Sequence, residues 1–569
     1  MFASLPTTAA DFADWDWTRI QPLFDALAER PLTPVNVDVW LADWSRLAAL
    51  VRESHERLWV ATTLDTGDAD AEARYKTYLQ TAIEPYEVAA QSLKTNLLAS
   101  SLEPTGFSVP LRKMRADAAL FANANLPLLT QEKALVHEYD RIMGAQTVLW
   151  DGAETTLEQL RPALFDPDRA VRERAWRATS ERQLLDRDAI NALWTKLLRL
   201  RGQLAANAGL PDYRAYRWQE LGRFDYTPDD CARFHDAIEA VVVPAANRLY
   251  ARRQRALGVE TVRPWDTDVD PYGRPPLKPY TQVNELIAGT RRIFEAVDPR
   301  LAVQFDRMVS GGALDLENRK GKAPGGYCTE FLTAGEPFIF MNAVGLHDDV
   351  QTLLHEGGHA FHIYAVAPLP FLQQKDQDSI PIEFLEVAST GMELLGQRYL
   401  AKPTGFYTPE DAARATCDLL EGMIRFWPYM AVVDAFQHWA CTHVDQAADP
   451  AACDARWAEL WLRFMPGEDW TGLDEAMKTG WQRKAHIHEV PFYYVEYGIA
   501  QLGALQLWRA SLDNPQAALD AYHRALALGY TAPLPDLFAT AGGRFALDVA
   551  TLRECVELAE GTIERLSAG

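Results

Sequence analysis

Three of the chain's twelve histidines lie in the short stretch HEGGHAFHIY, residues 355–364. In an α-helix, residues four positions apart lie on one face, one turn above the other. His355 and His359 would therefore direct two imidazoles towards a common point, and neutral imidazole nitrogen is a good zinc ligand. Glu356 could then accept a proton from an activated water, as in HExxH metallopeptidases. The stretch predicts a zinc site, although a polar helix face with hydrogen-bonded histidines has the same spacing.

A third protein ligand must come from another segment, because a catalytic zinc uses three protein ligands and a water. The segment DSIPIEFLEVASTGMELL, residues 378–395, has the pattern of a second helix. Its glutamates at 383, 386 and 393 lie on or near one helix face. Glu386 is the preferred ligand and Glu383 its competitor. Glu393, two turns after Glu386, is suited to holding a ligand histidine in place.

Two glycines, Gly357 and Gly358, lie inside the predicted histidine helix. Each destabilises a helix by roughly 1 kcal/mol relative to alanine, so stability alone would not select them. They are explained if a substrate or a neighbouring helix approaches the backbone closely. His362 lies off the face of the two candidate ligands, and we interpret it as structural.

A second group of polar aromatic residues occurs in HIHEVPFYYVEY, residues 486–497. Peptide hydrolysis by an activated water needs donors for the oxyanion that forms at the carbonyl, and imidazole and phenol groups can supply them. The sequence offers five such donors: His486, His488, Tyr493, Tyr494 and Tyr497. An aromatic-rich core helix is the alternative interpretation.

The elements that must position these residues are mainly helical. Apolar residues recur at spacings of three and four through 34–64, 166–210 and 227–258, the last with a bend or break at Pro244. Strand signals are few, and the best is EPFIFMNAV, residues 336–344, after the glycine-rich GKAPGGYCTEF. The Pro- and Gly-rich segment 263–278 predicts a long surface connection.

The composition is that of a soluble globular protein, with 48% hydrophobic and 24% charged residues in 569. A formal net charge of −23 argues against binding to nucleic acid or to an anionic membrane, since both need basic patches. The six cysteines form no CxxC pair, and neither a secretory signal nor an eighteen-residue apolar run is present. We therefore expect a reduced, cytoplasmic protein without a membrane span.

Four motifs, GKAPGGYCTEF, HEGGHAFH, EFLEVASTGME and HIHEVPFYYVEYGIAQ, occur in this order. In this order they resemble the thimet oligopeptidase family of zinc metallopeptidases, and most of all its oligoendopeptidase F and Pz-peptidase branch. The resemblance is strong over about 315–510 and looser over the preceding helices. It implies a mainly α fold with two lobes, a deep substrate channel and a small edge sheet near the HExxH helix. A soft boundary near 187–211, where one helical array gives way to another, further predicts an N-terminal helical region (1–195) and a catalytic domain (196–569).

The resemblance further implies one zinc ion per chain, held by His355, His359 and Glu386, with Glu356 as general base. The family's late histidine and tyrosines correspond to His486, Tyr494 and Tyr497, with His488 as second choice. Backbone groups of 338–342 are expected to pair with the extended substrate as an edge strand.

The implied activity is hydrolysis of internal bonds in short unstructured peptides. A zinc carboxypeptidase or dipeptidyl carboxypeptidase on a similar scaffold is the alternative; it would need a cation such as Arg483 or Lys484 to grip the free C-terminus.

Overall fold

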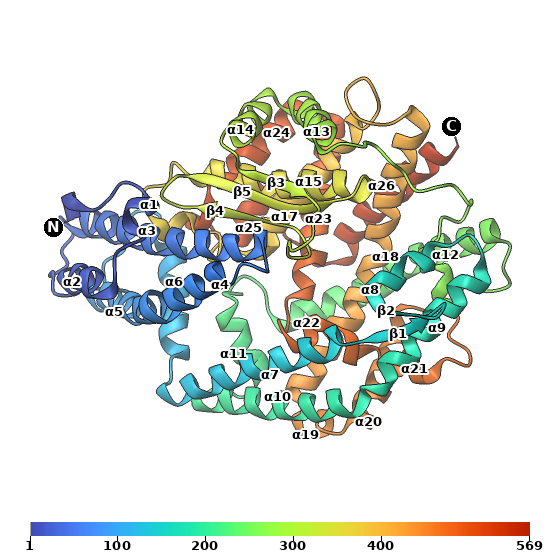
Figure 1. Cartoon of the computed structure of the whole chain (residues 1–569), viewed down its shortest axis with the longest axis horizontal. Helices are drawn as coiled ribbons and strands as arrows, with labels where there is room; N and C mark the ends of the chain where they lie inside the picture. The colour runs from blue at the N-terminus through green and yellow to red at the C-terminus, as the bar shows by residue number, and fades with distance from the viewer. Residues whose placement is uncertain (1, 569) are drawn as a thin grey trace. The chain divides into compact units, whose positions relative to one another are not determined.

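The computed structural model describes residues 2–568 and is predominantly helical, with two small sheets (Figure 1). The expectation of a mainly α fold is confirmed. The chain forms two compact units, each assembled from three separate stretches: 1–118, 277–415 and 503–545 in unit 1, and 119–276, 416–502 and 546–569 in unit 2. The predicted division between residues 195 and 196 falls inside a helix and stays a prediction.

Unit 1 contains the first five helices, the three-stranded sheet and both helices of the predicted zinc site. Its elements are α1 (Ala9–Phe12), α2 (Trp17–Ala28), α3 (Val37–Leu64), α4 (Ala69–Tyr78), α5 (Glu84–Ser100), α13 (Val283–Val297), α14 (Pro299–Ser310), β3 (Leu314–Glu317), β4 (Tyr327–Phe331), β5 (Glu336–Ala343), α15 (His347–Val366), α16 (Leu372–Lys375), α17 (Ile382–Gly396), α24 (Pro515–Leu526) and α25 (Leu534–Thr540).

Unit 2 is helical apart from one hairpin. Its elements are α7 (Leu126–Gly144), β1 (Thr147–Trp150), β2 (Ala153–Thr156), α8 (Leu157–Leu160), α9 (Arg169–Leu185), α10 (Arg187–Asn207), α11 (Tyr213–Glu220), α12 (Pro228–Leu257), α19 (Val444–Ala447), α20 (Pro450–Phe464), α21 (Asp474–Lys478), α22 (Ala485–His488) and α26 (Val549–Ser567). Three of the five points of division fall within helices, namely α6 (Ser108–Leu120), α18 (Pro409–Thr442) and α23 (Tyr494–Asp513).

The helices predicted from periodicity are present, but the positions at which they are interrupted differ from the prediction. The segment 166–210 forms two helices, α9 and α10, which meet at Asp186. Asp168 caps α9 by accepting a hydrogen bond from the backbone N–H of Ala170. The segment 227–258 stays one helix through Pro244, with Thr227 as N-cap and Gly258 in the left-handed conformation after its last turn.

The three-stranded sheet of unit 1 has the order β3-β5-β4, with β3 parallel and β4 antiparallel to β5. The run predicted as a strand forms β5, and five of its residues in succession are buried. Because β5 is central, ladder partners lie on both of its sides. The expectation that 338–342 is an edge strand open to a substrate is therefore wrong, and the outer strands β3 and β4 provide the edges.

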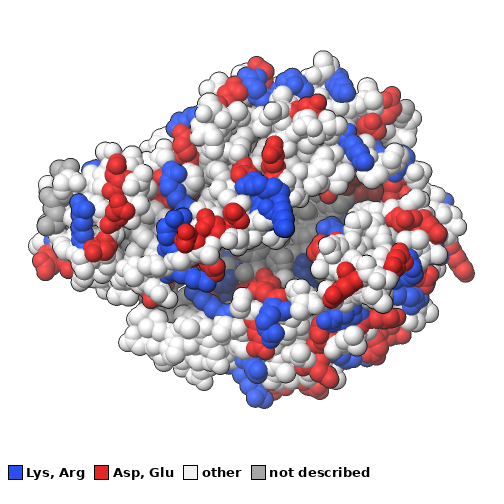
Figure 2. Space-filling model, in the orientation of Figure 1, with Lys and Arg blue, Asp and Glu red and all other residues white. Residues whose placement is uncertain are grey.

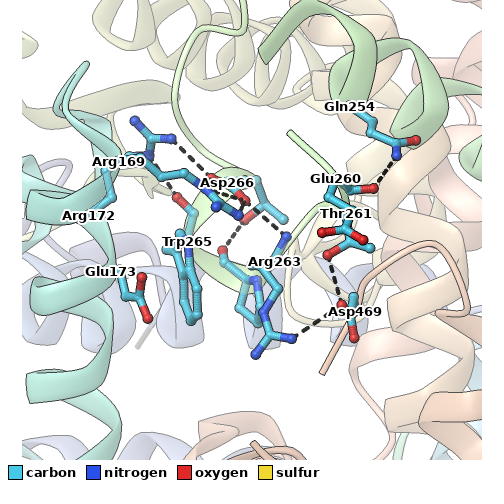
Figure 3. A network of polar contacts seen from close by, with 12 residues as sticks. Arg169, Arg172, Glu173, Gln254, Glu260, Thr261, Arg263, Trp265, Asp266 and Asp469 are labelled. Atoms are coloured by element: carbon cyan, nitrogen blue, oxygen red, sulfur yellow. Dashed lines mark hydrogen bonds and ion pairs between the residues drawn. The ribbon is translucent and has the colours of Figure 1, made fainter. Parts of the chain in front are cut away.

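The Pro- and Gly-rich segment 263–278 is not simply a surface connection. Its short 3₁₀ turn, Pro264–Asp266, is buried. Asp266 accepts hydrogen bonds from Arg169 Nη2 at 2.8 Å and Arg172 Nη2 at 3.0 Å, both on α9 (Figure 3). A buried carboxylate needs such partners because unpaired charge is strongly disfavoured away from water. The segment is thus fixed to α9 within unit 2.

Charge on the molecular surface is mixed in sign. Figure 2 shows lysines and arginines interspersed with aspartates and glutamates over the face in view. Many charged side chains form ion pairs, such as Arg248 and Glu560 at 2.6 Å. Among residues 2–568, no helix has the length and apolar character needed to cross a bilayer.

The two glycines of α15 are explained by close packing. A Cβ atom added to Gly358 would lie 2.6 Å from the Cα of Ser389 and 2.7 Å from the carbonyl oxygen of Ala388, both on α17. A Cβ added to Gly357 would lie 2.5 Å from the ring of Phe294 on α13. The sequence offered two explanations for these glycines, a substrate or a neighbouring helix close to the backbone. The structure shows the neighbouring helix. At Gly358 the two backbones touch with no side chain between them.

We expect Gly358→Ala to lower the free energy of unfolding by about 1–3 kcal/mol, because α17 must move to admit the methyl group. Urea unfolding followed by circular dichroism would measure the change. Gly202→Ala is the matched control, since Gly202 lies in α10 with no atom within 4 Å of an added Cβ. The control should be neutral or stabilising by up to about 1 kcal/mol. Equal losses in both variants would contradict the packing explanation.

Candidate metal centre

Helix α15 begins at a tightly fixed turn. The Asp349 carboxylate accepts hydrogen bonds from the backbone N–H groups of Val344, Gly345 and Leu346, at 2.8–2.9 Å. The hydroxyl of Tyr280 donates a further hydrogen bond to the same carboxylate. These contacts satisfy donors at the helix N-terminus and place a negative charge where the helix dipole favours it. The start of the helix that carries the histidines is thereby held in place.

His355 and His359 lie on one face of α15, as their spacing predicts. Their ring centroids are 4.9 Å apart, with the ring planes at 80°. One nitrogen from each ring and one carboxylate oxygen of Glu386 on α17 lie within 4.8 Å of one another. The distance from His355 Nε2 to Glu386 Oε2 is 3.4 Å. This is the spacing of ligand atoms around a shared cation, each about 2 Å away.

The structure distinguishes Glu386 from the other glutamate and histidine that the sequence offered near the candidate site. Glu383 is buried on the same helix but does not belong to the group of converging ligand atoms. His362 is fully buried, with its ring 6.0 Å from that of Phe384, and is also outside the group. Glu386 is the carboxylate that joins the two histidines.

Two further side chains orient the candidate ligands. The carboxylate of Glu393 accepts a hydrogen bond from His355 Nδ1 at 2.7 Å, which leaves Nε2 directed at Glu386. A carboxylate on the far nitrogen of a ligand histidine fixes its tautomer and ring orientation. Spacing along the helix anticipated this role for Glu393. The Ser389 hydroxyl donates to Glu386 Oε2 at 3.2 Å, a contact that the sequence interpretation missed.

The protein surroundings favour positive charge among these groups. Burial disfavours the charged form of His355, but hydrogen bonds with Glu386 and Glu393 outweigh it and raise its pKa well above the usual range. Burial lowers the pKa of His359 to about 4. For Glu386, burial is outweighed by the hydrogen bond with His355 and the charge of His359, so its pKa is lowered. A cation at the same place would be stabilised by the same two carboxylates.

Glu356 lies beside these groups in a buried position on α15. Burial raises its pKa to about 7, and the nearby carboxylates of Glu386 and Glu393 add to the shift. The charge of His355 and a hydrogen bond from the backbone N–H of Cys328 act in the opposite direction. The Cys328 contact comes from β4 and was not anticipated, although it lies within the glycine-rich motif noted in the sequence.

The late aromatic group lies in unit 2. The ring centroid of His486 is 4.8 Å from that of Tyr494 and 6.2 Å from that of Tyr497. His488 faces elsewhere: it is fully buried and stacks on Tyr139, with centroids 4.3 Å apart. His486 is therefore the histidine that shares a cluster with the predicted tyrosines, and His488 is part of the core.

The two cations considered for a carboxypeptidase are engaged within unit 2. Arg483 donates to the carbonyl of Ala476 at 2.6 Å. The Nζ atom of Lys484 lies 3.9 Å from the ring centroid of Tyr494, and burial lowers the pKa of Lys484 to about 8. Neither contact favours a grip on a substrate C-terminus.

Comparison with known proteins decides the family. A sequence model of peptidase family M3 matches residues 164–557. The chain belongs to peptidase family M3. This M3 peptidase has no match among curated protein sequences.

Solved structures resemble this M3 peptidase over essentially its whole length. Pz peptidase A, determined with an inhibitor, has a TM-score of 0.85 at 24% identity, covering 100% of this chain and 99% of that one. A chain described as an oligoendopeptidase F has a TM-score of 0.84 at 25% identity, with the same coverage. A third chain, described as an oligoendopeptidase F from Bacillus anthracis, has a TM-score of 0.81 at 21% identity, and the match covers 96% of each chain. The predicted family and branch are confirmed, and the protein is a metalloendopeptidase.

We expect Glu386→Ala to lower the bound divalent metal by about one ion per chain, because it removes one of three converging ligands. Glu383→Ala is the matched control on the same helix and should retain the metal. Elemental analysis after dialysis against metal-free buffer would measure both variants. Loss of metal in Glu383→Ala with retention in Glu386→Ala would reverse the assignment.

Proposed function

We propose that this M3 peptidase is a zinc-dependent oligoendopeptidase that hydrolyses internal bonds of short, unstructured peptides. The observation that carries the proposal is the convergence of His355, His359 and Glu386, with Glu356 next to the first histidine. Two imidazoles and a carboxylate are the donor set of catalytic zinc sites in which one position stays open.

The residues fit a zinc ion in number and chemistry. His355 and His359 would each supply a ring nitrogen, and Glu386 a carboxylate oxygen, while Glu393 fixes the ring of His355. Zinc bound there would act as a Lewis acid that lowers the pKa of a water and polarises the scissile carbonyl.

Glu356 is the proposed general base. Its carboxylate would accept the proton that the attacking water loses and would later return that proton to the nitrogen of the departing amine. The Cys328 N–H, by its hydrogen bond, holds the carboxylate and keeps one oxygen engaged. Such transfer contributes about 10²–10⁴ to the rate in enzymes that use a positioned base.

His486, Tyr494 and Tyr497 are the proposed donors to the oxyanion of the tetrahedral intermediate. Their mutual packing in unit 2 supports treating them as one group. Burial, with the nearby charge of Lys484, lowers the pKa of His486 to about 4. A neutral imidazole at working pH donates one N–H without placing a full charge in the site.

The proposed substrates and location follow from the family and from cysteine chemistry. Oligoendopeptidase and Pz-peptidase relatives support short peptides as substrates, with the bond cut away from the chain ends. All six cysteines, which lie within residues 2–568, carry thiols rather than disulfides. Thiols of this kind fit a reducing compartment such as the cytoplasm.

We expect Glu356→Gln to lower kcat/KM for an internally quenched peptide by at least about 10²-fold, because the amide cannot accept the proton. Zinc content should match that of the unsubstituted protein, since Glu356 is not one of the three ligands. Removing zinc with a chelator should abolish hydrolysis, and restoring it should recover the rate. Undiminished turnover in Glu356→Gln would refute this base.

We expect His486→Ala to lower kcat by about 10²–10³-fold, the effect of losing one oxyanion donor. His488→Phe is the matched control, because it keeps an aromatic ring on Tyr139 and should keep kcat within a few fold of the original. Steady-state kinetics on both variants would test the choice between the histidines. A larger loss in His488→Phe, with its fold intact by circular dichroism, would favour His488.

A further inference from the structure

A second group of metal-binding side chains lies in unit 2, between α12 and α18. Cys231 and His235 are four residues apart on α12, and Asp434 and His438 are four residues apart on α18. Each pair therefore lies on one face of its helix. The periodicity of these helices gave no reason to single these residues out, because the two segments are distant in the sequence.

Three of these residues bring ligand atoms together. Cys231 Sγ, a carboxylate oxygen of Asp434 and a ring nitrogen of His438 lie within 4.8 Å of one another. The distance from His438 Nε2 to Asp434 Oδ2 is 3.3 Å. Cys231 and Asp434 are fully buried, and the side chain of His438 is 12% exposed. The arrangement resembles the donor geometry on α15 and α17 but includes sulfur.

Hydrogen bonds within the cluster leave some of its buried polar atoms without a partner. His235 Nε2 contacts Asp434 Oδ2 at 2.9 Å, which accounts for one carboxylate oxygen. The other oxygen, Oδ1, and the Nδ1 atom of His438 are buried and make no hydrogen bond. Buried polar atoms without partners are uncommon in folded proteins, because each one lowers the stability of the fold. A bound cation would supply a partner to the carboxylate and to one imidazole nitrogen together.

We propose that Cys231, Asp434 and His438 form a second metal site, which binds zinc or a chemically similar divalent ion. Thiolate, imidazole and carboxylate are ligands that zinc accepts in proteins, and three of them leave one position of a tetrahedral shell. His235 serves as the outer partner that holds the Asp434 carboxylate. The ion joins α12 to α18 within unit 2.

Charge balance supports a divalent ion at this place. A thiolate and a carboxylate carry two negative charges, which neutralise a divalent ion and so reduce the penalty of burying it. Aromatic rings surround the cluster, with Trp218 and Phe492 at 5.6 and 5.2 Å from His438 between ring centroids. The charge of Arg214 also acts on His438 and opposes a cation there.

This site is independent of the proposed catalytic zinc. It uses other residues, lies within unit 2, and contains sulfur, which the α15–α17 group lacks. A spectroscopic signal from a metal–sulfur bond therefore does not come from the α15–α17 group, whatever the outcome there.

The test is a cobalt(II) titration of the metal-free, full-length protein. Cobalt bound to a thiolate shows charge-transfer absorption in the near ultraviolet, whereas cobalt held by imidazole and carboxylate does not. We expect this absorption to rise and saturate, and zinc to displace it. Absence of the absorption at cobalt saturation would overturn the proposal without any variant.

Two cysteine variants test whether Cys231 supplies the sulfur atom that binds cobalt. Cys231→Ser should abolish the absorption. Cys453→Ser is the matched control and should retain it, because Cys453 is also a buried cysteine of unit 2 but contacts the carbonyl of Ala447. Absorption that persists in Cys231→Ser would place the cobalt on another cysteine and overturn the assignment. His235→Ala should weaken cobalt binding by about 10–100-fold, as loss of an outer partner does.

Zinc content gives a second measurement that does not depend on Cys231→Ser folding. In His355→Ala/His359→Ala, which removes the α15 ligands, we expect about one zinc ion per chain to remain after dialysis. A double variant that is folded by circular dichroism and holds no zinc would overturn the second site. Its hydrolytic activity would report separately on the proposed catalytic zinc.

Discussion

The backbone contact between α15 and α17 is the constraint on which the candidate metal centre depends. Gly358 lies against the main chain at Ala388 and Ser389, so no side chain separates the two helices at this point. At this separation, a glutamate on α17 reaches the histidines of α15 without bridging a layer of side chains. A larger residue at 358 would push Glu386 away from His355, even though residue 358 touches neither of them.

In both candidate metal sites, an ionisable side chain lies between two partners that can carry the opposite charge. His355 lies between the carboxylates of Glu386 and Glu393, and Asp434 lies between His235 and His438. In each group, the hydrogen bonds and charges of the partners outweigh the burial that disfavours ionisation. The same arrangement that stabilises a proton can stabilise a divalent cation, because both need negative charge held in a low-dielectric interior.

Local patterns in the sequence predicted much of the fold and the residues that converge in the candidate metal centre. Helical periodicity located the long helices, and fixed spacing brought His355 and His359 onto one face and indicated Glu386. What the sequence could not provide were contacts between distant segments. The central position of β5 depends on strand order, which no property of 336–343 encodes. The burial of Asp266 depends on arginines of α9, far from it along the chain.

The late aromatic group illustrates the same limit within a short stretch. His486 and His488 have equal claims as donors in the sequence, and only packing separates them. Tyr139, on which His488 stacks, lies on α7 and is distant from His488 along the chain. Spacing identifies which residue types are available, whereas tertiary packing determines which of them remain accessible for chemistry.

The side chains of the candidate metal centre lie near one another along the chain as well as in space. The candidate ligands, the proposed general base, the orienting carboxylate and the glycine that allows the helices to touch all fall within 347–396, which comprises α15, α16 and α17. One contiguous stretch of the chain therefore carries all three candidate ligands. Sequence change in the surrounding helices leaves the identity of these ligands unchanged.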